Sequence, residues 1–265
     1  MRDKRSSYEK SHDLGERFVR RQLGLDSGHF SYLLRPAEAP TFILIPGSFS
    51  DSFALREIID HLDQKLQLVV VELRGHGGSW PPPRDSSIAA FGRDVLRVVD
   101  EMKLESFYIG GHSIGRMIAL EVGRVRPHSV RGIVSIEGWT SHHVVPAAFD
   151  GLIDNTLSAA QAARNEQLRQ RVLQHWTEEQ VEEFRTYWKK WNGDAFLRGT
   201  DLPILELYGD RGRERPGREK LRIPQKDNID LQWLAGASHN LHIERPREVA
   251  RASGDFIAKI EGKGR

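Results

Sequence analysis

Hydrophobic and polar positions divide the chain into short apolar runs and longer segments with helical spacing. The apolar runs are rich in β-branched and aromatic residues, as buried strands are. They lie at residues 30–34, 41–45, 66–71, 107–109, 132–136, 204–208 and 231–234. Segments in which apolar positions recur every three or four residues predict helices at 53–62, 88–102, 117–125 and 249–260. Strands that alternate with helices predict an α/β fold, with a mostly parallel sheet covered on both faces.

One segment, from about residue 141 to about residue 192, interrupts this alternation. It contains no run of strand character, and Ser158-Ala-Ala-Gln161 and Thr177-Glu-Glu-Gln180 both match the capping box that begins a helix. After the second box, aromatic and apolar side chains recur at helical spacing and form a stripe. The stripe is Val181, Phe184, Trp188 and Trp191.

The aromatic stripe has two interpretations. In the first, it docks its helix on the core. In the second, the helices form a cap over an active site, and Trp176, Trp188 or Trp191 lines an apolar substrate pocket. We therefore expect a core domain at residues 1–140 and 196–265, with a helical cap at residues 141–195 inserted after the sixth strand.

Composition narrows the class of protein. The chain has 265 residues, 29% of them charged, and no apolar run approaches the roughly 20 residues that span a bilayer. The N-terminal residues lack the apolar stretch of a secretory signal, so a cytoplasmic location without membrane contact is expected. The chain has no cysteine, which excludes disulfides and thiolate metal sites, and we expect neither a metal nor a cofactor.

Charge argues against a nucleic-acid partner, because the net charge is only +2. The one basic cluster, from Arg211 to Arg222, is interspersed with Glu214 and Glu219 and is expected to be a solvated loop. A small molecule is therefore the expected partner. The sequence does not determine an oligomeric state.

The most informative motif is the pentapeptide Gly111-His112-Ser113-Ile114-Gly115. A predicted strand precedes it and a helix-compatible segment follows. In that setting the two glycines permit a tight, strained turn that lifts the serine hydroxyl towards substrate. The pattern predicts that Ser113 is a nucleophile.

A histidine that activates Ser113 is expected late in the chain. His239 follows the last predicted strand, so it is expected at the carboxyl edge of the sheet, where Ser113 also emerges. A serine hydroxyl is a weak nucleophile until an imidazole takes its proton. His242 competes for this role, but it stands next to the final helix and is followed by apolar Ile243.

With these landmarks the chain resembles the α/β-hydrolase superfamily over nearly its whole length. The resemblance rests on segments 45–48, 72–79, 111–115, 207–210 and 236–239. It implies an eight-stranded α/β-hydrolase fold, and it implies that the backbone N–H groups of Ser48 and Ile114 form an oxyanion hole. Many members have His-Gly where this chain has Pro46-Gly47, a change that leaves a main-chain donor in place.

The acid of the triad departs from the commonest pattern of that superfamily. The usual position, three residues beyond Gly209, is Gly212, which has no side chain to orient a histidine. Glu137, at the end of the sixth strand and 24 residues after Ser113, supplies a carboxylate instead. This layout resembles haloalkane dehalogenases and zearalenone-type lactonases, and it implies that Glu137 orients His239. Asp210 is the alternative acid.

Two residues near these positions add pocket candidates. Trp139 follows Glu137 closely and is assigned to the substrate pocket. Arg116 follows the last glycine of the pentapeptide, where the superfamily commonly has a small residue. It is expected either to reach solvent along its helix or to project towards a substrate carboxylate. A third alternative is that an arginine at this position impairs the turn that carries Ser113.

These residues predict acyl transfer through Ser113, His239 and Glu137, on an ester or lactone with an apolar or aromatic body. Dehalogenase and epoxide hydrolase chemistry would need an aspartate in place of Ser113. Two alternatives stay open. One is a cofactor-free dioxygenase that acts on an N-heteroaromatic substrate with His239 as the base. The other is a hydrolase-like ligand-binding protein with little turnover.

Overall fold

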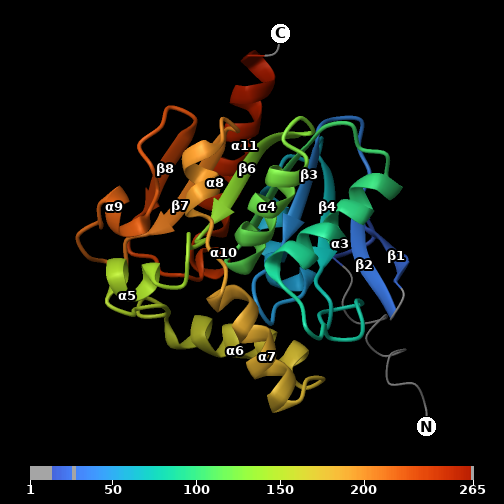
Figure 1. Ribbon diagram of the computed structural model, residues 1–265, viewed down its shortest axis with the longest axis horizontal. Helices are drawn as coiled ribbons and strands as arrows, with labels where there is room; N and C mark the ends of the chain where they lie inside the picture. The colour runs from blue at the N-terminus through green and yellow to red at the C-terminus, as the bar shows by residue number, and fades with distance from the viewer. Residues whose placement is uncertain (1–13, 26–27, 264–265) are drawn as a thin grey trace.

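The strands of the chain form one sheet, in the order β1-β2-β4-β3-β5-β6-β7-β8 (Figure 1). The computed structural model describes residues 14–25 and 28–263. The strands are β1 (Val19–Leu25), β2 (Gly28–Arg35), β3 (Thr41–Ile45), β4 (Gln67–Glu72), β5 (Phe107–His112), β6 (Val130–Ile136), β7 (Ile204–Gly209) and β8 (Ile229–Leu234). β1 pairs antiparallel with β2, and β2 antiparallel with β4, while every later pairing is parallel. The predicted mostly parallel sheet is confirmed.

The helices alternate with these strands. They are the short η1 (Ser52–Leu55), α2 (Arg56–His61), α3 (Ile88–Glu101), α4 (Ile114–Val125), α5 (Val144–Phe149), α6 (Ala159–Leu173), α7 (Glu178–Lys189), α8 (Asp194–Gly199), α9 (Arg218–Leu221), α10 (Leu241–Glu244) and α11 (Pro246–Lys263).

Alternating side chains of the central strands build two separate hydrophobic cores. In β3, Ile43 and Ile45 enter the core beneath α3 and α4, while Phe42 and Leu44 enter the core beneath α2 and α11. Successive side chains of a strand point to opposite faces, so a continuous apolar run is needed where both faces are covered. β1 was not predicted, because this edge strand exposes most of its polar residues and has no apolar run.

The segment between β6 and β7 contains only the helices α5 to α8. Its two ends meet, since Ser141 bridges Asn192 and the Gly193 N–H donates to the Thr140 carbonyl at 2.9 Å. Figure 1 shows α6 and α7 together at one end of the sheet. Both predicted capping boxes are present at the starts of these two helices. The division into core and cap domains stays a prediction, and its boundary at 195/196 falls inside α8.

Within the two described stretches, 14–25 and 28–263, no helix combines the length and apolar character needed to cross a membrane.

Candidate active site

Ser113 occupies a sharp turn between β5 and α4. Its backbone has φ 55° and ψ −118°, an unusual conformation for a residue with a side chain. Glycines on both sides make the turn possible. A Cβ added at Gly111 or Gly115 would lie 2.5 or 2.3 Å from the Ile45 carbonyl oxygen, closer than atoms can approach. The turn therefore packs directly against β3, and the Ser113 side chain lines a cavity of about 400 Å³.

His239 lines the same cavity, on the loop between β8 and α10. Hydrogen bonds hold its backbone from two sides. Its N–H donates to the Ile153 carbonyl at 2.9 Å, and its carbonyl accepts from His112 Nε2 at 2.7 Å. Since His112 immediately precedes Ser113, this second bond ties the serine turn to the histidine loop.

His112 is a neutral donor in this arrangement. Burial, followed by the nearby His242 and His239, holds the pKa of His112 well below its usual range. Its Nε2 therefore carries the proton that is donated to the His239 carbonyl. A Cβ at Gly47 would lie 2.6 Å from His112 Nδ1, so the imidazole fits against β3's loop only because position 47 is glycine.

Glu137 approaches the ring of His239 from behind the cavity. It directly follows β6 and has φ 51°. Its Oε2 lies 3.4 Å from His239 Nδ1, and its Oε1 accepts from the Gly209 N–H at 2.6 Å. The structure thus brings together Glu137 and His239, which the sequence places 102 residues apart.

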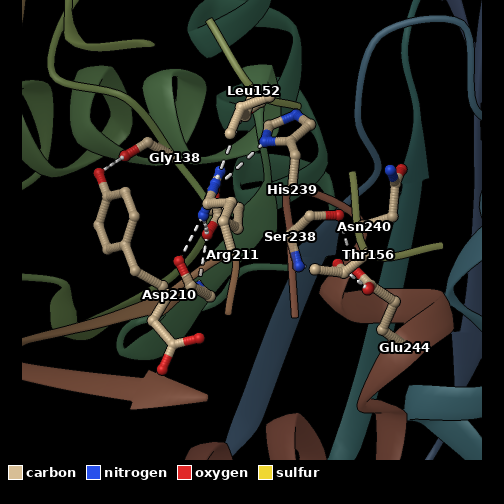
Figure 2. Close-up of polar contacts among 12 residues, drawn as sticks. Gly138, Leu152, Thr156, Asp210, Arg211, Ser238, His239, Asn240 and Glu244 are labelled. Atoms are coloured by element: carbon tan, nitrogen blue, oxygen red, sulfur yellow. Dashed lines mark hydrogen bonds and ion pairs between the residues drawn. The ribbon is translucent and has the colours of Figure 1, made fainter. Parts of the chain in front are cut away.

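Arg211 also binds Glu137, a partnership that the sequence analysis missed. Its guanidinium donates to both carboxylate oxygens, at 2.5 and 2.7 Å, and stacks 3.7 Å from the centre of the Phe149 ring. Figure 2 shows the further contact of Arg211 with the Leu152 carbonyl. The expectation of a solvated basic loop is wrong for Arg211, whose side chain is only 1% exposed. No pairing rule in the sequence links a loop arginine to a carboxylate 74 residues away.

Asp210, the alternative acid, makes its contacts with the two loops that follow β7 and β8. Its Oδ1 accepts from the N–H groups of Gly212 and Gly236, at 2.9 and 2.8 Å. Its other oxygen lies 3.7 Å from Arg215 Nε. The structure describes no contact between Asp210 and His239.

A second polar network fixes the loop around His239 (Figure 2). Glu244 accepts from both the N–H and the hydroxyl of Ser238, at 2.8 and 2.9 Å, and also binds Thr156. Asn240 binds Asp154. The loop that carries His239 is therefore anchored to the segment that precedes α6.

Ser48 and Ile114, the expected oxyanion-hole residues, both line the cavity. Among the described residues, no atom accepts a hydrogen bond from either backbone N–H. The neighbouring Phe49 N–H is occupied, because it donates to His76 Nε2 at 2.9 Å. His76 Nδ1 in turn donates to the Arg74 carbonyl at 3.0 Å, so a buried, neutral imidazole holds the turn that presents Ser48.

Arg116 neither reaches solvent nor lines the cavity, so both of these expectations are wrong. Its side chain is fully buried and forms an ion pair with Glu206, which is also fully buried. The arginine passes beneath Gly138, where an added Cβ would lie 2.3 Å from Arg116 Cβ. The side chain fits because residue 138 has none.

The tryptophans divide into two groups. Trp139 and Trp188 line the cavity, and the Trp139 ring lies 4.6 Å from the ring of His239. Trp176 donates to the Gly75 carbonyl at 2.7 Å, and Trp191 donates to Glu121 at 2.9 Å. The structure thus places Trp176 and Trp191 in the packing of the helices, contrary to the expectation that they line the pocket. Across the part of the chain that is described, no three carboxylate or imidazole groups cluster as a metal site requires.

Comparison with known proteins agrees with this architecture. Residues 40–206 match a family described as having the alpha/beta hydrolase fold. A RutD protein of Agrobacterium fabrum, provisionally assigned as a carbamate hydrolase, is 31% identical over 105 residues. These residues make up 39% of this chain and 40% of that protein, so the curated relative is matched over less than half its length.

Solved structures are similar over most of the chain. A membrane phospholipase A has a TM-score of 0.77 at 17% identity and covers 97% of this chain and 90% of its own. Est816, described as an N-acyl homoserine lactone degrading enzyme, has a TM-score of 0.71 at 21% identity, with coverages of 89% and 100%. At these identities the similarity shows the fold alone.

Proposed function

The chain belongs to the α/β-hydrolase fold family, and we propose that it is a serine hydrolase that cleaves a carboxylic ester or lactone through an acyl-enzyme. One observation carries the proposal. Ser113, in a strained turn, and His239 line the same cavity, and Glu137 contacts the ring of His239 from behind. These are the three roles of nucleophile, base and orienting acid.

The first step is attack of the Ser113 hydroxyl oxygen on the substrate carbonyl carbon. His239 accepts the hydroxyl proton as the new C–O bond forms. Because His239 Nδ1 faces Glu137, its Nε2 is the nitrogen left for this proton. The negative charge of Glu137 stabilises the imidazolium that results.

The oxyanion then accepts hydrogen bonds from the backbone N–H groups of Ser48 and Ile114, neither of which has an acceptor among the described residues. Removal of one such donor in other hydrolases costs roughly 3–4 kcal/mol of transition-state stabilisation. The leaving alcohol takes the proton from His239, which frees the imidazole for a second cycle. Water then gives a proton to His239 and its oxygen to the acyl group, and the acid leaves as Ser113 regains its proton.

The surroundings favour a substrate with an apolar or aromatic body. Trp139 and Trp188 form a wall of the cavity. The activity named for the RutD relative, on a carbamate, also concerns a carbonyl bound to a leaving heteroatom. A dioxygenase would use His239 and Glu137 but would not need the Ser113 hydroxyl, whereas the hydrolase gives a role to all three side chains, which favours the hydrolase.

The experiment is a hydrolysis screen over p-nitrophenyl esters of graded chain length and a set of lactones and carbamates. Ser113→Ala is expected to abolish hydrolysis and labelling by a fluorophosphonate, while circular dichroism and melting temperature stay close to those of the wild type. Near wild-type turnover by Ser113→Ala would overturn the proposal. Oxygen consumption with a hydroxyquinolone panel, without ester hydrolysis, would favour the dioxygenase instead.

A further inference from the structure

The segment between β6 and β7, which contains α5 to α8, is called the helical insertion here. Two of its arginines line the cavity that contains Ser113. Arg169 comes from α6 and Arg185 from α7. Neither residue was singled out from the sequence, because arginines on amphipathic helices usually face solvent. Their presence places guanidinium groups in the same cavity as the reacting serine.

Arg169 has no hydrogen-bond or ion-pair partner among the described residues, and its Nε is buried from solvent. A buried donor without an acceptor is costly, since the group has given up water without replacement. Arg185 binds Glu182, at 2.5 Å, but this pair lies one helical turn apart at the surface, and its members are 38% and 65% exposed. Such exposed pairs are weak and exchange readily for another anion.

The charges around the cavity do not neutralise Arg169. Asp154 is the one acidic side chain in the lining that the structure describes, and it is engaged by Asn240. Glu137 lies behind His239 and is already paired with Arg211. Arg185 already has Glu182 as its anion, so Arg169 is the cation of the lining that has no anion among the described residues.

We propose that Arg169, with Arg185 of the same cavity, binds a carboxylate on the substrate of Ser113, so that the preferred ester or lactone carries one free carboxylate. This inference rests on the proposed function. A guanidinium matches the two oxygens of a carboxylate in a planar, bidentate contact. Because both arginines belong to the insertion and Ser113 to the sheet edge, the insertion selects the substrate while the sheet edge supplies the chemistry.

The test compares two p-nitrophenyl esters of equal chain length, the glutarate monoester, which carries a carboxylate, and the neutral valerate. Because the glutarate carboxylate also expels p-nitrophenolate by closing to the cyclic anhydride, the rate without enzyme is subtracted for each ester. In the wild type, kcat/KM is expected to be higher for the glutarate ester. Arg169→Gln is expected to lower the ratio of the two kcat/KM values by about 10- to 100-fold, mainly through KM. Arg169→Lys keeps the positive charge but not the two parallel N–H donors of the guanidinium, so it should recover part of the kcat/KM ratio. Arg164→Gln removes an exposed arginine of the same helix, paired with Glu57, and should leave the ratio unchanged.

A binding measurement separates this inference from the proposed function. Calorimetry with Ser113→Ala is expected to show tighter binding of glutaranilic acid than of neutral valeranilide, and Arg169→Gln in that background should remove the difference. One outcome is that the valerate ester is hydrolysed through Ser113 while Arg169→Gln changes neither the kcat/KM ratio nor the difference in binding. In that case the carboxylate site is wrong and the hydrolase proposal stands. If no ester is hydrolysed, the calorimetry still decides the site. Tighter binding of the matching phosphonate would show that a dianion, and not a carboxylate, is the ligand.

Discussion

Arg211 holds both carboxylate oxygens of Glu137 in a buried, two-pronged ion pair, at 2.5 and 2.7 Å. The same carboxylate contacts the ring of His239 at 3.4 Å. Burial alone would raise the pKa of Glu137, but the charge and hydrogen bonds of Arg211, with His239, outweigh burial and lower it. Arg211 is thus a positioning residue, which keeps Glu137 ionised and aimed while Glu137 acts on the imidazole.

Replacement of Arg211 tests this role. Arg211→Gln leaves a buried carboxylate without its cation, so the pKa of Glu137 should rise and the acidic limb of the kcat/KM profile should move to higher pH. Loss of one partner of a buried pair also costs about 3–5 kcal/mol of stability. Arg211→Lys keeps the charge and should shift the limb less. An acidic limb that does not move in either folded variant would show that Arg211 only packs the loop.

The choice of acid is decided by two amide substitutions. Glu137→Gln keeps the shape but removes the charge that supports His239, so kcat should fall by a large factor, up to about 10⁴-fold. Asp210→Asn retains the oxygen that accepts from Gly212 and Gly236, so kcat should change far less. Steady-state kinetics on one ester compares them directly. If Asp210→Asn loses most of its activity while Glu137→Gln stays active, the acid that orients His239 is Asp210 and not Glu137.

Two tryptophans should respond to replacement in opposite ways. Trp188 lines the cavity, so Trp188→Ala should change the ratio of kcat/KM between aromatic and short aliphatic esters. Trp176 packs against Phe49, His76 and Phe184, so Trp176→Ala should lower stability by about 3 kcal/mol and leave that ratio unchanged. Melting curves and a two-ester assay separate the outcomes. If the two variants show the same ratio of kcat/KM between aromatic and short aliphatic esters, Trp188 is a packing residue like Trp176.

Buried neutral histidines should make stability depend on pH. Burial lowers the pKa of His76 from 6.5 to about 4 and that of His242 to about 3. Below pH 6.5 these histidines bind protons in the unfolded chain but not in the folded chain. The free energy of unfolding should therefore decrease as the pH is lowered from 6.5 to about 4. Each histidine contributes a slope of at most about 1.4 kcal/mol per pH unit.

Urea unfolding at a series of pH values measures how the free energy of unfolding depends on pH. His76→Gln keeps an acceptor for the Phe49 N–H and a donor for the Arg74 carbonyl, and it should reduce the slope between pH 4 and 6.5. His128→Gln, at an exposed position, is the matched control. An unchanged slope in His76→Gln would mean that the imidazole takes up its proton in the folded state.

Local patterns were sufficient for most of the fold. Apolar runs determined which strands lie inside the sheet, and two capping boxes determined where α6 and α7 begin, because both depend on neighbouring residues alone. The turn at Ser113 was also predictable, since only glycine fits at positions 111 and 115. The edge strand β1 was not predicted, because its residues are mostly exposed and its apolar residues do not alternate regularly with polar ones.

The pairing of charges was decided only by the tertiary structure. Arg116 was expected at the surface or in the pocket but is buried against Glu206, and Arg211 was expected in solvent but binds Glu137. Arg169 lies in the cavity and has no partner within the part of the chain that the structure describes. The physical reason is common to all three. An arginine on a helix or loop has the same local pattern whether it meets water, a carboxylate or the wall of a cavity. The outcome depends on which distant segment packs against it.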